Sequence, residues 1–136
     1  MPKVRVTRRV HFSAAHRLHN PALSEVENRD TFGLCNSPNF HGHNYELDVT
    51  VEGEPDPATG YVVDLGKLRA AAETVIGDLD HRNLNVDVPW LQGVLPSTEN
   101  LVVAIWQRLE PLVPRGRLAR LVLWETPRNY AEYTGD

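Results

Sequence analysis

Three histidines have the residue types and the spacing of metal ligands. His41 and His43 flank Gly42 in a stretch that alternates between apolar and polar residues. In a β-strand both imidazoles would project from one face, about 7 Å apart along the chain. His16 lies on the apolar face of an earlier alternating stretch. A lone half-buried histidine is ordinary, but antiparallel pairing of the two stretches would gather three neutral imidazoles. With an open fourth position, this ligand set is typical of catalytic zinc.

The only cysteine lies in an irregular segment, six residues before His41. A lone cysteine is often a small buried hydrophobic residue. Beside a zinc ion in a loop, however, Cys35 favours a usable thiolate. It could equally be a fourth zinc ligand that closes the site and makes it structural, and the sequence leaves both interpretations open.

Two carboxylates stand where proton transfer or ligand binding could use them. Asp80 directly precedes His81, and a carboxylate beside a histidine can orient the ring and stabilise its protonated form. Glu125 is in phase with Leu121 and Leu123 on the apolar side of a predicted strand. An unpaired carboxylate there is costly, so Glu125 requires a hydrogen-bonding or cationic partner in the protein, or a ligand that offers donors.

Two long alternating stretches predict the strands that carry the histidines. Apolar residues recur at every second position over 3–18 and again over 41–52, as in half-buried strands. A turn over 54–60 and a short strand over 61–63 are expected to continue the hairpin. The segment 20–40 has no periodicity and is predicted as a long loop.

Two helices and two further strands complete the expected order. Asp64 is a predicted N-cap for a helix over 65–79, and Ser97 opens a second helix that ends by Pro111 or Pro114. Alternation over 117–125 and a short segment near 130–133 predict the last two strands. The order ββααββ indicates an α+β domain, with a four-stranded antiparallel sheet and both helices on one face. Its open edges favour an oligomer.

Length and composition exclude several classes of protein. The chain has 136 residues, 41% hydrophobic and 24% charged, which predicts one globular domain over residues 1–136. A net charge of −4 disfavours a general nucleic-acid binder. No apolar run is long enough for a membrane span or a signal peptide. A single cysteine indicates a reducing compartment, so we expect a cytoplasmic protein. From its charge and its short apolar runs we expect neither nucleic-acid nor membrane partners.

Five ordered motifs resemble one enzyme family over nearly the whole chain. The motifs are Phe12-Ser-Ala-Ala-His16, Cys35-x5-His41-Gly-His43-Asn-Tyr45, Leu79-Asp80-His81-x-Asn83-Leu84, Ser97-Thr98-Glu99-Asn100 and Glu125-Thr126. In this order they resemble 6-pyruvoyl-tetrahydropterin synthase and its relative, 6-carboxytetrahydropterin synthase of queuosine biosynthesis. The resemblance implies the tunnelling fold, in which trimers close a barrel and two trimers form a hexamer.

The resemblance also implies a substrate, 7,8-dihydroneopterin triphosphate, and a role for each motif. Site residues are implied as follows: zinc ligands His16, His41 and His43; proton-transferring base Cys35; relay Asp80 and His81; pterin anchor Glu125; further substrate contacts Thr98 and Glu99. Family sites lie between subunits of a homo-oligomer. The five residues between Cys35 and His41 favour the pyruvoyl-forming branch over the 6-carboxy branch. A non-catalytic zinc or pterin-binding protein, with Cys35 closing the metal site, is the alternative from another class.

Overall fold

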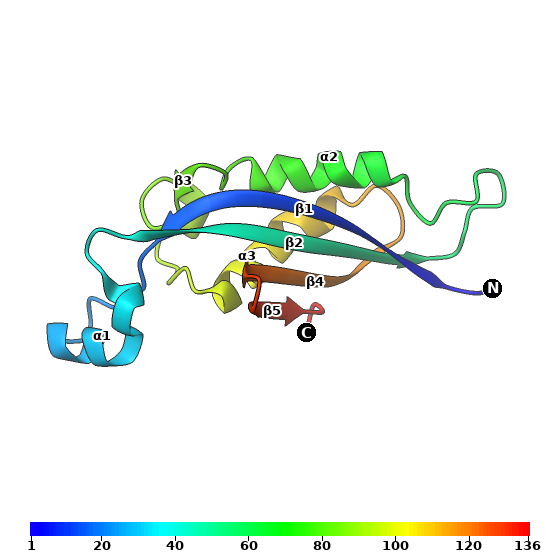
Figure 1. The fold of residues 1–136 in the computed structure, drawn as a ribbon. Helices are drawn as coiled ribbons and strands as arrows, with labels where there is room; N and C mark the ends of the chain where they lie inside the picture. Colours follow the sequence, from blue (N-terminus) through cyan, green and yellow to red (C-terminus); the bar gives the residue numbers. More distant parts are fainter.

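A five-stranded sheet in the order β3-β1-β2-β4-β5 forms the frame of the molecule (Figure 1). The computed structural model describes residues 1–136. Its strands are β1 (Val4–His16), β2 (His41–Gly53), β3 (Arg82–Asn83), β4 (Arg117–Thr126) and β5 (Asn129–Tyr133). Neighbouring strands are antiparallel except for β1 and β3, which are parallel. The α+β class is confirmed, but the expected four-stranded antiparallel sheet lacked β3, because two residues are too few to show alternation.

Two of the three helices begin where their capping residues predict. The helices are α1 (Glu25–Phe32), α2 (Leu65–Ile76) and α3 (Thr98–Leu109), with 3-10 turns η1 (Gly33–Asn36), η2 (Pro89–Leu91) and η3 (Glu110–Leu112). The Asp64 carboxylate accepts hydrogen bonds from the first amides of α2, and the Ser97 hydroxyl accepts one from the Asn100 amide in α3. None of the helices has the length and hydrophobicity needed to cross a bilayer.

Helix α1 lies in the segment that was expected to be a loop. The Ser24 hydroxyl accepts a hydrogen bond from the Glu27 amide at 3.1 Å, and the Glu27 carboxylate accepts one from the Ser24 amide at 3.0 Å. This capping box satisfies amides at the helix start. The single buried residue of α1 is Asn28, whose side-chain amide donates to the carbonyls of Asn20 and Ser24. Because polar bonds and not an apolar face hold this helix, hydrophobic periodicity missed it.

The segment 61–63 does not form the expected short strand. Val62 and Val63 are both buried, so the side chains do not alternate between core and solvent. The Arg115 guanidinium donates hydrogen bonds to the carbonyls of Tyr61 and Val62 at 2.8 and 2.7 Å. These bonds occupy acceptors that a strand partner would otherwise use.

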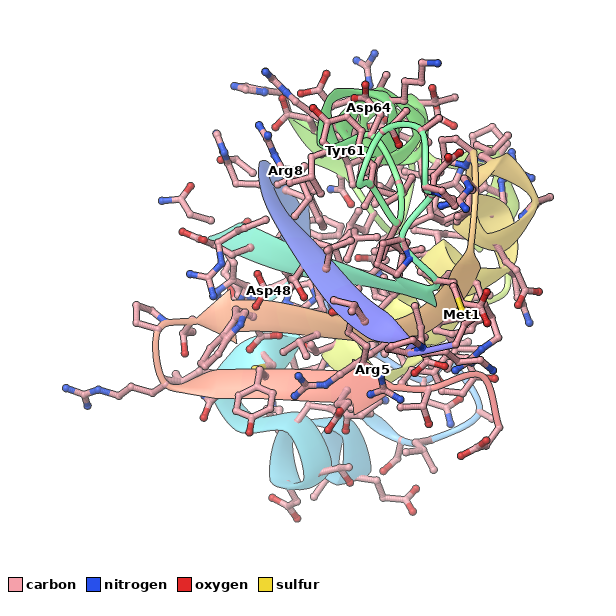
Figure 2. All side chains as sticks on the ribbon, turned by 90° about the vertical axis from the view of Figure 1, so that its right-hand side faces the viewer. Met1, Arg5, Arg8, Asp48, Tyr61 and Asp64 are labelled. Carbon is pink, nitrogen blue, oxygen red and sulfur yellow. The ribbon has the colours of Figure 1, made fainter.

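The two faces of the sheet differ in chemistry. Helices α2 and α3 pack on one face, where Phe12, Tyr45 and Leu121 are fully buried in a continuous apolar core. The other face carries charged residues and has no helix over it. Figure 2 shows α2 and α3 to one side of the strands and Asp48 on the other side. Asp48 pairs there with Arg9 from the neighbouring strand at 2.7 Å.

Candidate metal centre and active site

The three predicted ligands meet where β1 ends and β2 begins. The antiparallel register places His16 opposite His41 and Ala14 opposite His43, so all three rings lie on the helix-covered face. Their ligand nitrogens are all within 4.8 Å of one another. The ring centroids are 4.5 to 5.1 Å apart. The structure therefore brings together the trio that the strand pattern predicted.

The hydrogen bonds around these rings fit a metal ion. His16 Nδ1 lies 2.8 Å from the Pro96 carbonyl oxygen, to which it can only donate. This bond leaves Nε2 of His16 as the lone-pair nitrogen, and that atom is buried without a partner. Nε2 of His43 and both ring nitrogens of His41 are buried without partners as well. Buried polar atoms are rarely unsatisfied in proteins, and a metal-binding histidine typically donates its other N–H to a carbonyl or carboxylate.

Burial favours the neutral form of two of the three rings. It lowers the pKa of His16 against the opposing effects of the Pro96 carbonyl and the Glu125 carboxylate, and it lowers the pKa of His43 against that of Glu125. The neutral imidazole is the form that binds metals. Tyr45 lies against the same rings. Burial, with Glu125 and Cys35 nearby, raises the pKa of Tyr45 and keeps its hydroxyl protonated.

Glu125 faces the histidines, on the side of the sheet that its phase with Leu121 and Leu123 predicts. The pairing of β4 with β5 is irregular at this residue, because Trp124 pairs with Tyr130 and Thr126 pairs with Asn129, while Glu125 between them is out of register. One carboxylate oxygen accepts the Thr98 hydroxyl at 2.6 Å. The two carboxylate oxygens lie 3.8 Å from Nε2 of His16 and of His43 respectively. Thr98 is thus the hydrogen-bonding protein partner expected for Glu125, which is half-buried.

Cys35 lies beside the histidine cluster but does not belong to it. The residue is half-buried in η1, and its carbonyl oxygen accepts a hydrogen bond from the Leu18 amide at 2.8 Å. That bond ties η1 to the chain that continues from His16. A thiol that transfers protons must not be bound to the metal, whereas a fourth ligand would have to lie within the histidine cluster. The position of Cys35 outside the cluster fits the first role.

Asp80 and His81 form a pair at the outer edge of β1. Asp80 accepts a hydrogen bond from the Ser13 amide at 2.9 Å and lies 3.0 Å from His81 Nδ1. The bond from Ser13, followed by the His81 contact, lowers the pKa of Asp80. His81 has a φ of 60°, an uncommon conformation for a residue with a side chain. Its side chain is 82% exposed and makes no hydrogen bond or ion pair with the three histidines.

Two hollows adjoin the centre. A cavity of about 550 Å³ is bordered by His43, Trp124 and Glu125, and a second one of about 500 Å³ is bordered by His43 and His81.

Glu99 lies in the first turn of α3, exposed and without a side-chain hydrogen bond. No local pattern predicts the Pro96 carbonyl as partner of His16, because the two residues are 80 positions apart.

Known proteins resemble the whole chain. Residues 5–136 match the family described as 6-pyruvoyl tetrahydropterin synthase. The 6-pyruvoyl tetrahydrobiopterin synthase of Homo sapiens is 46% identical over 135 residues, covering 98% of this chain and 93% of the human protein. A dihydroneopterin monophosphate aldolase of Pyrococcus furiosus is 36% identical over 124 residues, covering 90% of each chain.

A solved structure agrees in fold as well as in sequence. The 6-pyruvoyl tetrahydropterin synthase of Caenorhabditis elegans has a TM-score of 0.95 at 41% identity, covering 100% of this chain and 98% of the other. With the matched family spanning nearly every residue and the histidine cluster in place, the chain belongs to the 6-pyruvoyl tetrahydropterin synthase family.

Proposed function

We propose that the protein converts 7,8-dihydroneopterin triphosphate to 6-pyruvoyl-tetrahydropterin and releases triphosphate, with Zn²⁺ held by His16, His41 and His43. The observation that carries this proposal is the convergence of unpartnered imidazole nitrogens beside a carboxylate. Relatives that carry the pyruvoyl-forming name at 46% identity support it.

Glu125 is suited to anchor the pterin ring. The Thr98 hydroxyl bonds one of its oxygens and fixes the carboxylate in place, while both oxygens retain further lone pairs. The pterin ring offers a ring N–H beside a 2-amino group, and a carboxylate can accept both hydrogen bonds at once. The cavity of about 550 Å³ beside Glu125 provides space for a flat bicyclic ring.

Two groups are placed to move protons on the substrate side chain. When bound, zinc supplies Lewis-acid polarisation of the side-chain oxygens. Cys35, in the turn beside the cluster, takes a proton from a side-chain carbon. Asp80 accepts the Nδ1 proton of His81 and so leaves His81 Nε2 free to exchange a proton with the other carbon.

A ring-forming homo-oligomer, trimeric or hexameric, completes this proposal. His81 is exposed and does not contact the histidine cluster of its own chain, so a neighbouring subunit is the natural recipient of its imidazole. Strand β3 pairs only with Ala14 and Ala15 of β1, so most of the outer edge of β1 is available for pairing between subunits.

The decisive experiment is product identification. The zinc-loaded protein is incubated with 7,8-dihydroneopterin triphosphate, and the products are identified by mass. We expect 6-pyruvoyl-tetrahydropterin together with inorganic triphosphate. A 6-carboxy product would assign the other branch, an aldol cleavage product would place the protein with the Pyrococcus aldolase, and unchanged substrate would favour a binding protein.

A further inference from the structure

A third cavity, of about 370 Å³, lies around the turn that carries Cys35. Its walls include Leu34 and Asn36, the two chain neighbours of Cys35, together with Arg17, which directly follows His16. Helix α1 closes the cavity with Arg29. The lining therefore includes direct sequence neighbours of the candidate ligand His16 and of the candidate base Cys35.

The cavity holds two arginines whose charges no carboxylate neutralises. Neither Arg17 nor Arg29 lies within ion-pair distance of an acidic side chain. Arg17 Nε donates to the Asn36 carbonyl at 2.9 Å, which orients the guanidinium. The Arg29 side chain makes no hydrogen bond and is exposed. Glu25 is the one carboxylate in the lining.

The other cavities near the site offer no comparable pair of cations. Arg9 borders the cavity next to Glu125, but Asp48 and Glu46 hold it at 2.7 and 3.3 Å. The hollow beside His81 contains one arginine, Arg82, together with the carboxylate of Asp87. Of these three cavities, only the one around the turn of Cys35 is lined by two arginines without an ion-pair partner.

We propose that this cavity binds the triphosphate group of the substrate, an inference that rests on the proposed function. With the pterin ring at Glu125, the three-carbon side chain crosses the histidine cluster and its far end points away from Glu125. His16 Nε2 is 3.8 Å from Glu125, and Arg17, which follows His16 in the chain, lines the cavity. Guanidinium groups match phosphate oxygens in a bidentate geometry. In a chain of net charge −4, a polyanion requires such a local cationic site.

The test measures binding of inorganic triphosphate to the zinc-loaded protein by titration calorimetry. Arg29→Gln should weaken this binding roughly tenfold, the usual effect of removing one charge-assisted bond. Glu25→Gln should strengthen it, because the only opposing charge in the lining is removed. Lys67→Gln removes an exposed cation in α2, far along the chain from the cavity, and should leave binding unchanged. Added salt should reduce the difference between Arg29→Gln and the wild type.

Kinetics separate this inference from the proposed function. Arg29→Gln should raise KM for dihydroneopterin triphosphate about tenfold and leave kcat within about twofold. If the wild type forms the pyruvoyl product but Arg29→Gln and Glu25→Gln bind triphosphate as it does, the cavity assignment is overturned and the activity stands. If the wild type binds triphosphate and the two variants shift its affinity in opposite directions but no product forms, the activity fails while the anion site stands.

Discussion

At the scale of single residues, two hydrogen bonds orient the groups of the site: one orients the ring of His16 and the other orients the carboxylate of Glu125. The Pro96 carbonyl takes the Nδ1 proton of His16 and so turns the lone pair of Nε2 toward the other two rings. The Thr98 hydroxyl fixes the Glu125 carboxylate against them at 2.6 Å. Both partners lie at the start of α3, so one helix terminus positions a candidate metal ligand and the candidate substrate anchor together.

Replacement of His43 tests the metal centre. His43→Ala removes one of three converging ligands, so most of the bound zinc and the activity should be lost, because two imidazoles hold zinc much more weakly. Metal content is measured by elemental analysis after dialysis. His11→Ala, which removes an exposed histidine from β1, should retain the metal. Full zinc occupancy in His43→Ala would contradict the assignment of the three ligands.

Replacement of Cys35 separates a base from a ligand. Cys35→Ala should keep its zinc and bind substrate but lose turnover by roughly 10²–10⁴-fold, the range for removing a positioned proton-transfer group. Zinc content and turnover are measured on the same preparation, with Thr31→Ala from the adjacent helix as control. Release of zinc by Cys35→Ala would instead make the thiol a fourth ligand and the metal site structural.

At the scale of the elements, the pairing of β1 with β2 serves both faces of the sheet. The same register that aligns His16 with His41 places Arg9 opposite Asp48 on the uncovered face. Arg9 donates to both oxygens of Asp48 at 2.7 and 3.0 Å, and the Trp124 indole N–H reaches the same carboxylate from β4 at 3.3 Å. Asp48 therefore ties three strands together, and slippage of either long strand would separate this network and the histidines at once.

The Asp48 network predicts how stability depends on pH. The bonds from Arg9 hold the pKa of Asp48 below its ordinary value. The stabilisation is therefore fully present above the pKa of an unfolded aspartate and is lost as the pH falls through the lower, folded-state pKa. Asp48→Asn should reduce the free energy of unfolding at about pH 6, and the difference from wild type should shrink toward about pH 2.

Urea denaturation of both proteins across this pH range measures the effect. Any contribution from metal release at low pH is common to the two proteins and cancels in their difference. Asp30→Asn, an exposed carboxylate without a partner in α1, serves as the control and should show no such trend. A difference between Asp48→Asn and wild type that stays constant with pH would mean that the ion pair contributes nothing.

At the scale of the whole molecule, the sheet has one face that no helix covers and two edges made of short strands. β3 contributes two residues to one edge and β5 contributes five to the other. Figure 1 shows α1 projecting beyond the end of the sheet, away from α2 and α3. Because β3 covers only Ala14 and Ala15, most of the outer edge of β1 can pair with a strand of another chain, and closure of the sheets of several chains into a ring would remove the open edges.

Sedimentation tests this assembly. The protein should sediment at micromolar concentration as a trimer or hexamer of its 15.3 kDa chain, because sheet edges are satisfied in a closed ring. Dilution of the protein within the micromolar range should not produce a monomer peak. A stable monomer with full activity would contradict both the ring and the sharing of His81 between subunits.

The sequence by itself determined the elements whose residues repeat with a regular period. Alternation over 3–18 and over 41–52 predicted β1, β2 and the shared face of the three histidines. Asp64 and Ser97 predicted the starts of α2 and α3, because capping side chains act on amides only two or three residues away. The start of α1 also has a local signal, the capping box of Ser24 and Glu27. The helix was nevertheless not predicted, because it has no apolar face.

Only the tertiary structure decided what depends on contacts between distant positions. The two residues of β3 become a strand because β1 lies beside them, and Thr98 becomes the partner of Glu125 because α3 packs on β4. The Pro96 carbonyl reaches His16 across 80 positions, and Arg17, just past the end of β1, lines one cavity with Arg29 of α1 only in the folded chain. Local patterns record periodicity and capping, whereas such partnerships are fixed by packing, which no short stretch of sequence contains.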